Sequence, residues 1–189
     1  VVNQRHFTDR QVDFSKALTD LKKNKVDAIY WGGMDDVAAT LKKQLAEKSM
    51  KVQLLSADGA CTDRFIELSD RAANGLICSQ GGIPLSAIVK GRWFNRHYQH
   101  HFDGLPVQIY APQTYDAVYT IVQAMKIANS TDRESIAAAM PKVDFEGITG
   151  RIRFDPRGDI VNGPFTIFEV QNRQLAPKHV IRVNSADIN

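Results

Sequence analysis

Six consecutive residues read Ala28-Ile29-Tyr30-Trp31-Gly32-Gly33, a short apolar run that ends in a pair of glycines. Similar apolar runs follow at 52–55 and 76–78, and the chain opens on two valines. Short, mostly apolar runs are typical of strands that are buried on both faces of a sheet. We therefore predict strands that begin near Val1, Val26, Val52 and Gly75.

Amphipathic stripes lie between these runs. The first places apolar residues one helical turn apart, at Phe14, Ala17, Leu18 and Leu21. The second consists of Val37, Ala38, Leu41 and Leu45. Thr62 can cap a third helix that packs Phe65, Ile66 and Leu68 inward. Strands that alternate with helices imply crossover connections and a parallel sheet, so the first 80 residues are predicted to be α/β.

The pattern changes after this region. Helices are predicted from Pro84 through Phe102 and from Gln113 to Ala128, and Thr131-Asp132-Arg133-Glu134 has the form of a capping box for a third. From Phe145 onward the apolar residues alternate as in antiparallel strands, and residues 171–174 form the polar turn of a hairpin. A chain of this kind need not form one compact domain.

Basic and acidic residues nearly balance, with 24 Lys and Arg against 21 Asp and Glu and a net charge of +3 over 189 residues. Nucleic-acid binding requires basic residues clustered on one face, so nucleic acid is not an expected partner. No apolar stretch approaches the roughly 20 residues that span a bilayer, and this chain contains no signal peptide. Because it opens without Met on an expected strand, we interpret its start as a cut in a longer chain.

Ligands of a parallel sheet bind outside the carboxyl ends of its strands. Three predicted loops lie there, at residues 32–36, 56–62 and 79–82. Asp58 follows a strand directly and is expected to point into the crevice. Glycine pairs such as Gly32-Gly33 either admit a ligand or another backbone, or simply make a tight turn, and both interpretations stay open.

Several enzyme motifs are absent from the sequence. No G-x-G-x-x-G follows a strand, and there is no G-x-x-x-x-G-K-[ST] phosphate loop or G-x-S-x-G elbow. We therefore predict no catalytic residue, no cofactor and no metal. His97, His100 and His101 have a spacing that could hold a metal, but we interpret them as surface histidines because their immediate neighbours supply no carboxylate or thiolate. Asp155 and Asp159 lack the spacing of an EF-hand and are expected in a turn.

Two cysteines follow neighbouring predicted strands, Cys61 after one and Cys78 at the end of the next. If these strands are adjacent and parallel, both thiols lie at the same edge of the sheet. Their Cα atoms could then be separated by about 5–6 Å, as a disulfide requires. A bonded pair and two buried reduced thiols remain open alternatives at this point.

Five segments share their order and spacing with a known family. They are Asp13-Phe14-Ser15, Ile29-Tyr30-Trp31-Gly32-Gly33, Ala57-Asp58-Gly59, Tyr110 through Val118, and Phe145 through Gly150 with Phe154-Asp155 and Gly158-Asp159. Together they resemble the second lobe of the branched-chain amino-acid-binding proteins of bacterial ABC importers. The resemblance covers essentially the whole chain.

This resemblance implies an α/β, type I periplasmic-binding-protein fold: a lobe with a parallel sheet and crossover helices, plus helices and antiparallel strands from a second lobe. Residues 1–109 resemble most of the C-terminal lobe, residues 110–163 the return into the N-terminal lobe, and residues 164–189 the strands that return to the C-terminal lobe. The main body of the N-terminal lobe would be absent. We therefore expect residues from about Tyr110 to Gly163 not to pack fully onto the first sheet. The apolar stripe of the second long helix, with Tyr115, Val118, Tyr119 and Val122, is expected to be covered by a second copy, by exchanged segments or by disorder.

The resemblance also implies a ligand site. Asp58 occupies the place of the carboxylate that pairs with the ligand's ammonium, where the family often has Glu. Gly32 and Gly33 lie beside it, with Met34 where an aromatic residue often covers the ligand. Tyr110 resembles an aromatic residue that contacts the ligand side chain. The groups that hold the ligand's carboxylate belong to the N-terminal lobe and are not expected in this chain.

By resemblance, the protein is the non-catalytic solute-binding component of an ABC importer. Its ligand is an amino acid or small amide, its partner is the membrane permease, and its compartment is the periplasm. That oxidising compartment favours a disulfide between Cys61 and Cys78. A ligand-sensing domain of the same fold in a receptor or regulator is the alternative function, and a fragment of an α/β enzyme is a more distant one.

Overall fold

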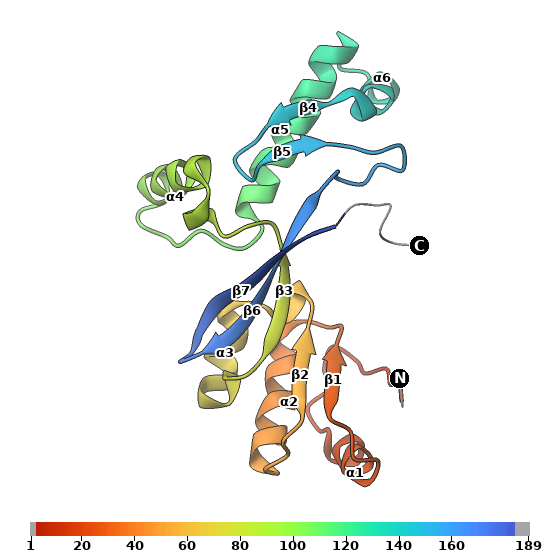
Figure 1. Ribbon diagram of the computed structural model, residues 1–189, viewed down its shortest axis with the longest axis vertical. Helices are drawn as coiled ribbons and strands as arrows, with labels where there is room; N and C mark the ends of the chain where they lie inside the picture. Colours follow the sequence, from red (N-terminus) through yellow and green to blue (C-terminus); the bar gives the residue numbers. More distant parts are fainter. Residues whose placement is uncertain (1–2, 184–189) are drawn as a thin grey trace. The chain divides into compact units, whose positions relative to one another are not determined.

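The structure is a computed structural model and describes residues 3–183 (Figure 1). Its strands are β1 (Ala28–Trp31), β2 (Gln53–Ser56), β3 (Ile77–Gly81), β4 (Asp144–Glu146), β5 (Arg151–Arg153), β6 (Gly163–Gln171) and β7 (Gln174–Val183). Its α-helices are α1 (Ser15–Lys23), α2 (Asp35–Glu47), α3 (Asp63–Ser69), α4 (Val89–His101), α5 (Ala111–Ala128) and α6 (Arg133–Ala139). Four short 3-10 helices are η1 (Asp58–Ala60), η2 (Asp70–Ala73), η3 (Leu85–Ala87) and η4 (Met140–Lys142).

The chain divides into two compact units. Unit 1 comprises Val1–Gln80 and Thr166–His179, and unit 2 comprises Gly81–Phe165 and Val180–Asn189. These divisions differ from the lobe boundaries expected at 109/110 and 163/164, because α4 clusters with the residues that follow it. The assignment of segments to the lobes of an intact protein stays a prediction.

Three of the four strands predicted in the first 80 residues are present in unit 1 as β1, β2 and β3. The order of the sheet is β1-β2-β3-β6-β7, and β2 pairs in parallel with both β1 and β3 (Figure 1). The register places Trp31 opposite Ser56 and Ser56 opposite Cys78, so these residues meet at one edge of the sheet. The predicted parallel sheet is therefore confirmed.

The strand β6 runs antiparallel to its neighbour β3. Val170 of β6 pairs with the two residues that precede β3: its carbonyl accepts from Gly75 N, and its amide donates to Leu76 O, both at 2.9 Å. β6 and β7 form a hairpin whose turn residues Asn172 and Arg173 have φ of 51° and 60°. Two successive left-handed residues match the twist of a two-residue hairpin turn. The hairpin predicted at residues 171–174 is confirmed.

A strand at the start of the chain was also predicted, and this prediction is wrong for the described residues. Residues 3–14 form no strand, while Val1 and Val2 lie outside the described part. Instead, Gln44 of α2 holds the segment: its side-chain amide donates to Val12 O and accepts from Phe14 N, both at 2.8 Å. Residues 3–6 are polar, so they offer no apolar face to add to the sheet.

The core of unit 1 comes from the predicted helix stripes and from the strands. Its largest fully buried side chains include Phe14, Leu18, Leu54, Phe65 and Leu76. Burial of such a side chain contributes about 1.5–3 kcal/mol. Thr62 caps α3 as predicted, since its side chain accepts a hydrogen bond from Phe65 N at 3.0 Å.

Unit 2 buries only one side of its long helix α5. Pro112, Asp116, Thr120 and Ala124 lie one turn apart along the buried side. On the other side Val118, Tyr119 and Val122 are 56%, 45% and 36% exposed. Tyr115, the fourth residue of the predicted stripe, is half-buried and packs edge-on against Phe94. Within the described part of unit 2 most of the stripe is therefore uncovered, and what covers it stays a prediction.

The helix α6 begins one residue later than the predicted capping box. Its cap is Asp132 rather than Thr131, and the Asp132 carboxylate accepts a hydrogen bond from Ser135 N at 2.9 Å. This hydrogen bond lowers the pKa of the Asp132 carboxyl below its ordinary value. Both residue types can cap a helix, and an aspartate carries the negative charge that a helix N-terminus stabilises.

Candidate ligand site at the carboxyl ends of β1 and β2

Asp58 lies directly beyond β2, at the first residue of η1. The residue is exposed, and its backbone carbonyl accepts a hydrogen bond from Cys61 N at 3.0 Å. Met34 ends the neighbouring loop after β1 and is 63% exposed. A carboxylate and an apolar side chain are thus presented by adjacent loops at one edge of the parallel sheet, where such sheets bind ligands.

The glycines of these loops let the two backbones meet. A Cβ on Gly59 would lie 3.0 Å from the carbonyl oxygen of Gly33 and 3.3 Å from the Met34 sulfur. A Cβ on Gly33 would lie 3.0 Å from the Trp31 ring. Gly32, in contrast, faces open space. Gly33 thus allows close approach of another part of the protein, while the ligand contacts predicted for Gly32 and Gly33 stay predictions.

Two further hydrogen bonds shape the loop after β1. The Trp31 indole N–H donates to Met34 O at 3.2 Å, across the turn. The buried Ser56 hydroxyl donates to Trp31 O at 3.0 Å, from β2. The Trp31 ring also packs edge-on against Phe14, with centroids 6.0 Å apart. The backbone that carries Gly32, Gly33 and Met34 is therefore anchored in the core of unit 1.

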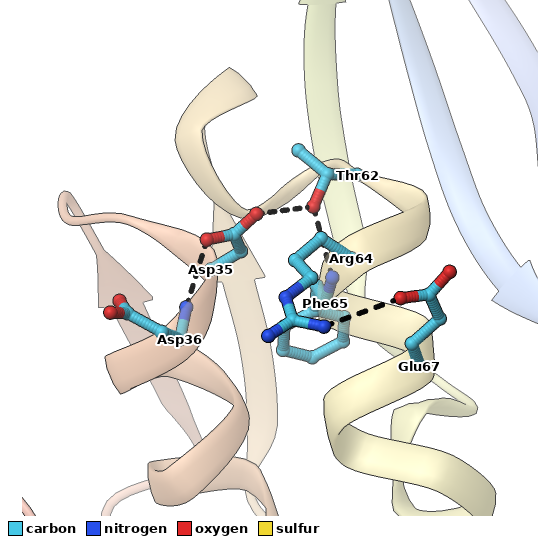
Figure 2. A network of polar contacts seen from close by, with 6 residues as sticks. All are labelled: Asp35, Asp36, Thr62, Arg64, Phe65 and Glu67. Carbon is cyan, nitrogen blue, oxygen red and sulfur yellow. Dashed lines mark hydrogen bonds and ion pairs between the residues drawn. The ribbon is translucent and has the colours of Figure 1, made fainter. Parts of the chain in front are cut away.

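A polar network connects the helices that follow the two loops (Figure 2). The Thr62 hydroxyl donates to Asp35 Oδ2 at 2.8 Å, while Asp35 Oδ1 accepts from Asp36 N at 2.9 Å. Asp35 begins α2, and Thr62 caps α3. The two helices pack against each other, so the network joins their N-termini.

Cys61 and Cys78 form a disulfide with a Cα separation of 5.5 Å. Both residues are buried, and the Gln80 side-chain amide donates to Cys61 O. The bond links the turn that bears Asp58 to β3, in the place where the parallel register brings the two cysteines together. The predicted disulfide is confirmed.

Loss of this disulfide should lower the free energy of unfolding by about 3 kcal/mol. Its loop has a sequence separation of 17 residues, and cross-linking a loop of about this size restricts the unfolded chain by about 3 kcal/mol in the chain-entropy account. Urea denaturation of a Cys61→Ala/Cys78→Ala variant measures the loss. Wild-type protein in reducing buffer is the control and should be weakened similarly. A change below about 1 kcal/mol in both would contradict the expectation.

Sequence comparison matches the chain to a family described as periplasmic binding protein, over residues 1–174. The chain belongs to the periplasmic binding protein family. The resemblance to the branched-chain amino-acid-binding members of this family, and with it the type I fold, is confirmed.

Several relatives of the branched-chain type support this assignment. The Leu/Ile/Val-binding protein homolog 2 of Brucella abortus is 29% identical over 158 residues, which are 83% of this chain and 42% of that protein. Homolog 1 from the same species is 30% identical over 78% of this chain and 39% of its own length. The solved structure of the leucine binding protein LivK from Thermotoga maritima is 27% identical, with a TM-score of 0.84 over 96% of this chain and 51% of LivK. The chain thus spans about half the length, or less, of these periplasmic binding proteins.

Tyr110, the remaining candidate from the sequence, belongs to unit 2. It precedes α5, where its backbone carbonyl accepts hydrogen bonds from the Thr114 amide and hydroxyl, both at 2.9 Å. Its side chain is exposed. Within unit 1 the structure brings the loops of Gly33, Met34 and Asp58 together, while the ligand contact of Tyr110 stays a prediction.

His97 of α4 and the Asp155 turn have local roles. His97 shares a hydrogen bond of 2.9 Å with Trp93 O and stacks on the Trp93 ring, with centroids 4.1 Å apart. Asp155 Oδ1 accepts from the backbone amides of Arg157 and Asp159, both at 2.9 Å, as in a tight turn. Within residues 3–183, no group of three or more His, Cys, Asp or Glu is placed to hold a metal. No helix in that range is long and apolar enough to cross a membrane.

One buried residue that stabilises unit 2 was not predicted from the sequence. Asp116 of α5 is only 3% exposed, and its carboxylate accepts from Ile148 N at 2.9 Å, Thr149 N at 2.8 Å and Thr149 Oγ1 at 2.5 Å. A Cβ on Gly147 would lie 2.5 Å from the same carboxylate. The available signal was that Asp116 shares one side of α5 with Pro112, Thr120 and Ala124, and a buried carboxylate requires polar partners.

Proposed function

We propose that the protein is the solute-binding component of an ABC importer and binds a branched-chain or related amino acid, or a small amide, without chemical conversion. The observation that carries this proposal is Asp58, an exposed carboxylate at the carboxyl end of a parallel strand. It lies on a loop that contacts Gly33 and Met34. The names of the relatives as Leu/Ile/Val-binding and leucine binding proteins support the choice of ligand class.

The two loops suit the chemistry of such a ligand. An amino acid that enters a closed cleft loses the water around its ammonium, and an unpaired buried ammonium is very costly. A charge-assisted hydrogen bond to a carboxylate offsets that cost, and Asp58 can supply it. Met34 is apolar and adaptable, so it can line the part of the cleft that holds an aliphatic side chain. Groups elsewhere in the natural protein would hold the ligand's carboxylate.

The same proposal covers the partners and the compartment. In the periplasm a disulfide such as Cys61–Cys78 persists, and the protein would deliver its ligand to the membrane permease. The exposed apolar side of α5, which includes Val118, Tyr119 and Val122, would be covered by another part of the natural protein or by a second copy. Large exposed apolar patches mark such contact surfaces.

A thermal-shift screen of the natural protein tests the function. We expect a rise in melting temperature of several degrees with L-leucine, L-isoleucine or L-valine, or with a related amino acid or small amide. A ligand at 100 times its Kd stabilises the folded state by about 2.7 kcal/mol. D-Leucine and a neutral sugar are controls that should give no shift. The absence of a shift with every L-amino acid and small amide at millimolar concentration would contradict the proposal.

A further inference from the structure

We propose that Asp35 and Thr62 are positioning residues that join the loop after β1 and the loop after β2 into one rigid ligand-binding surface. Figure 2 shows the pair at the N-termini of α2 and α3, with the Thr62 hydroxyl directed at the Asp35 carboxylate. Neither residue was predicted from the sequence to be part of the ligand site. The role in ligand binding rests on the proposed function, whereas the coupling of the two loops does not.

The geometry fixes the direction of the Thr62 hydroxyl. Its oxygen accepts a hydrogen bond from Phe65 N at 3.0 Å, because a backbone N–H can only donate. Its proton is therefore available for Asp35 Oδ2, which lies at 2.8 Å and can only accept when ionised. Thr62 thus caps its own helix and holds the neighbouring helix with the same hydroxyl. Both Asp35 and Thr62 are partly buried, where such a bond is stronger than in water.

The pair sits directly behind the candidate ligand contacts. Met34 immediately precedes Asp35, and Asp58 lies in the turn that leads to Thr62. Between them the two loops touch, since a Cβ on Gly59 would lie 3.0 Å from Gly33 O. A shift of one helix N-terminus against the other would therefore change the separation of the Asp58 carboxylate and the Met34 side chain.

The neighbouring polar contacts do not make this connection. Asp36 Oδ1 accepts from Val37 N at 2.7 Å, within α2. The ion pair between Arg64 and Glu67, at 3.5 Å, lies within α3 and is exposed. Asp36 is therefore a matched control for Asp35, because it has the same charge and lies at the same helix N-terminus, while its carboxylate accepts from Val37 N and the Thr62 hydroxyl donates to Asp35.

Hydrogen exchange tests the coupling of the loops in the natural protein. We expect Asp35→Ala to speed exchange of the Ala60 and Cys61 amides by about tenfold, since loss of a charge-assisted hydrogen bond raises the population of locally open states by at least that factor. Asp36→Ala should leave these amides unchanged. Thr62→Val should behave as Asp35→Ala does, and Thr62→Ser, which keeps the hydroxyl, should restore wild-type exchange.

Calorimetry with L-leucine and the other L-amino acids tests the role in binding. We expect Asp35→Ala and Thr62→Val to weaken binding by about tenfold, with wild-type affinity in Asp36→Ala and Thr62→Ser. Wild-type exchange at residues 60–61 in Asp35→Ala would overturn the coupling. Faster exchange with unchanged affinity would overturn the positioning role. If the wild-type protein binds no amino acid, the proposed function fails, and the exchange data still decide whether Asp35 and Thr62 join the loops.

Discussion

Replacement of Asp58 by alanine in the natural protein is expected to weaken amino-acid binding about a hundredfold or more. Removal of one partner of a buried charge pair costs about 2–5 kcal/mol, because the other charge is left unpaired. The hydrogen bond to Cys61 N is made by the backbone carbonyl of residue 58, so this bond of the turn does not require the carboxylate. Isothermal calorimetry with the ligand found by thermal shift measures the change.

The Asp58 experiment has a close control. Asp63 is exposed, carries the same charge and lies in the first turn of α3, so Asp63→Ala should keep wild-type affinity. Asp58→Asn keeps the shape of the side chain and should also bind weakly, because it lacks the negative charge. Affinity of Asp58→Ala within a few-fold of wild type would contradict the assignment and leave Asp58 as a residue of the turn.

Replacement of Asp116 by alanine should lower the free energy of unfolding by about 3 kcal/mol or more, because a buried donor that loses its acceptor costs about 1–3 kcal/mol. The carboxylate of Asp116 accepts three hydrogen bonds from Ile148 and Thr149, and its removal leaves their buried donors unsatisfied. Urea denaturation followed by circular dichroism measures the loss. Asp116→Asn retains an acceptor and should give a smaller, still measurable loss.

Two further variants test the Asp116 assignment. Gly147→Ala should destabilise the protein as well, since the added Cβ would lie 2.5 Å from the Asp116 carboxylate. Asp159→Ala removes the same charge from an exposed side chain of unit 2 and should change the free energy of unfolding by less than about 0.5 kcal/mol. A loss below about 1 kcal/mol in Asp116→Ala would show that the turn at 147–149 does not depend on this carboxylate.

Burial, helix caps and turns could be predicted from the sequence where they depend on helical periodicity or on residues close together in the chain. The stripe of Phe14, Ala17 and Leu18 is buried as expected, because a helix of period 3.6 places these residues on one side whatever lies opposite. The cap at Thr62 and the hairpin turn at 172–173 depend on residues at most three positions apart. The cap of α6 was misplaced by one residue, since both Thr131 and Asp132 suit that position.

For the candidate site, too, the sequence predicted one part and only the tertiary structure determined the other. That Asp58 and the Gly32-Gly33 pair lie at one edge of a sheet followed from strand order alone, because parallel strands end at the same edge. The atoms that meet there could not be predicted in this way. The approach of Gly59 to Gly33 and the hydrogen bond from Thr62 to Asp35 each join residues more than 20 positions apart. The same holds in unit 2 for the hydrogen bonds of Asp116 with residues 148 and 149. Such contacts form only when packing distances are right to within a few tenths of an ångström. Those distances are determined by how the helices pack on the sheet, and no local sequence pattern encodes them.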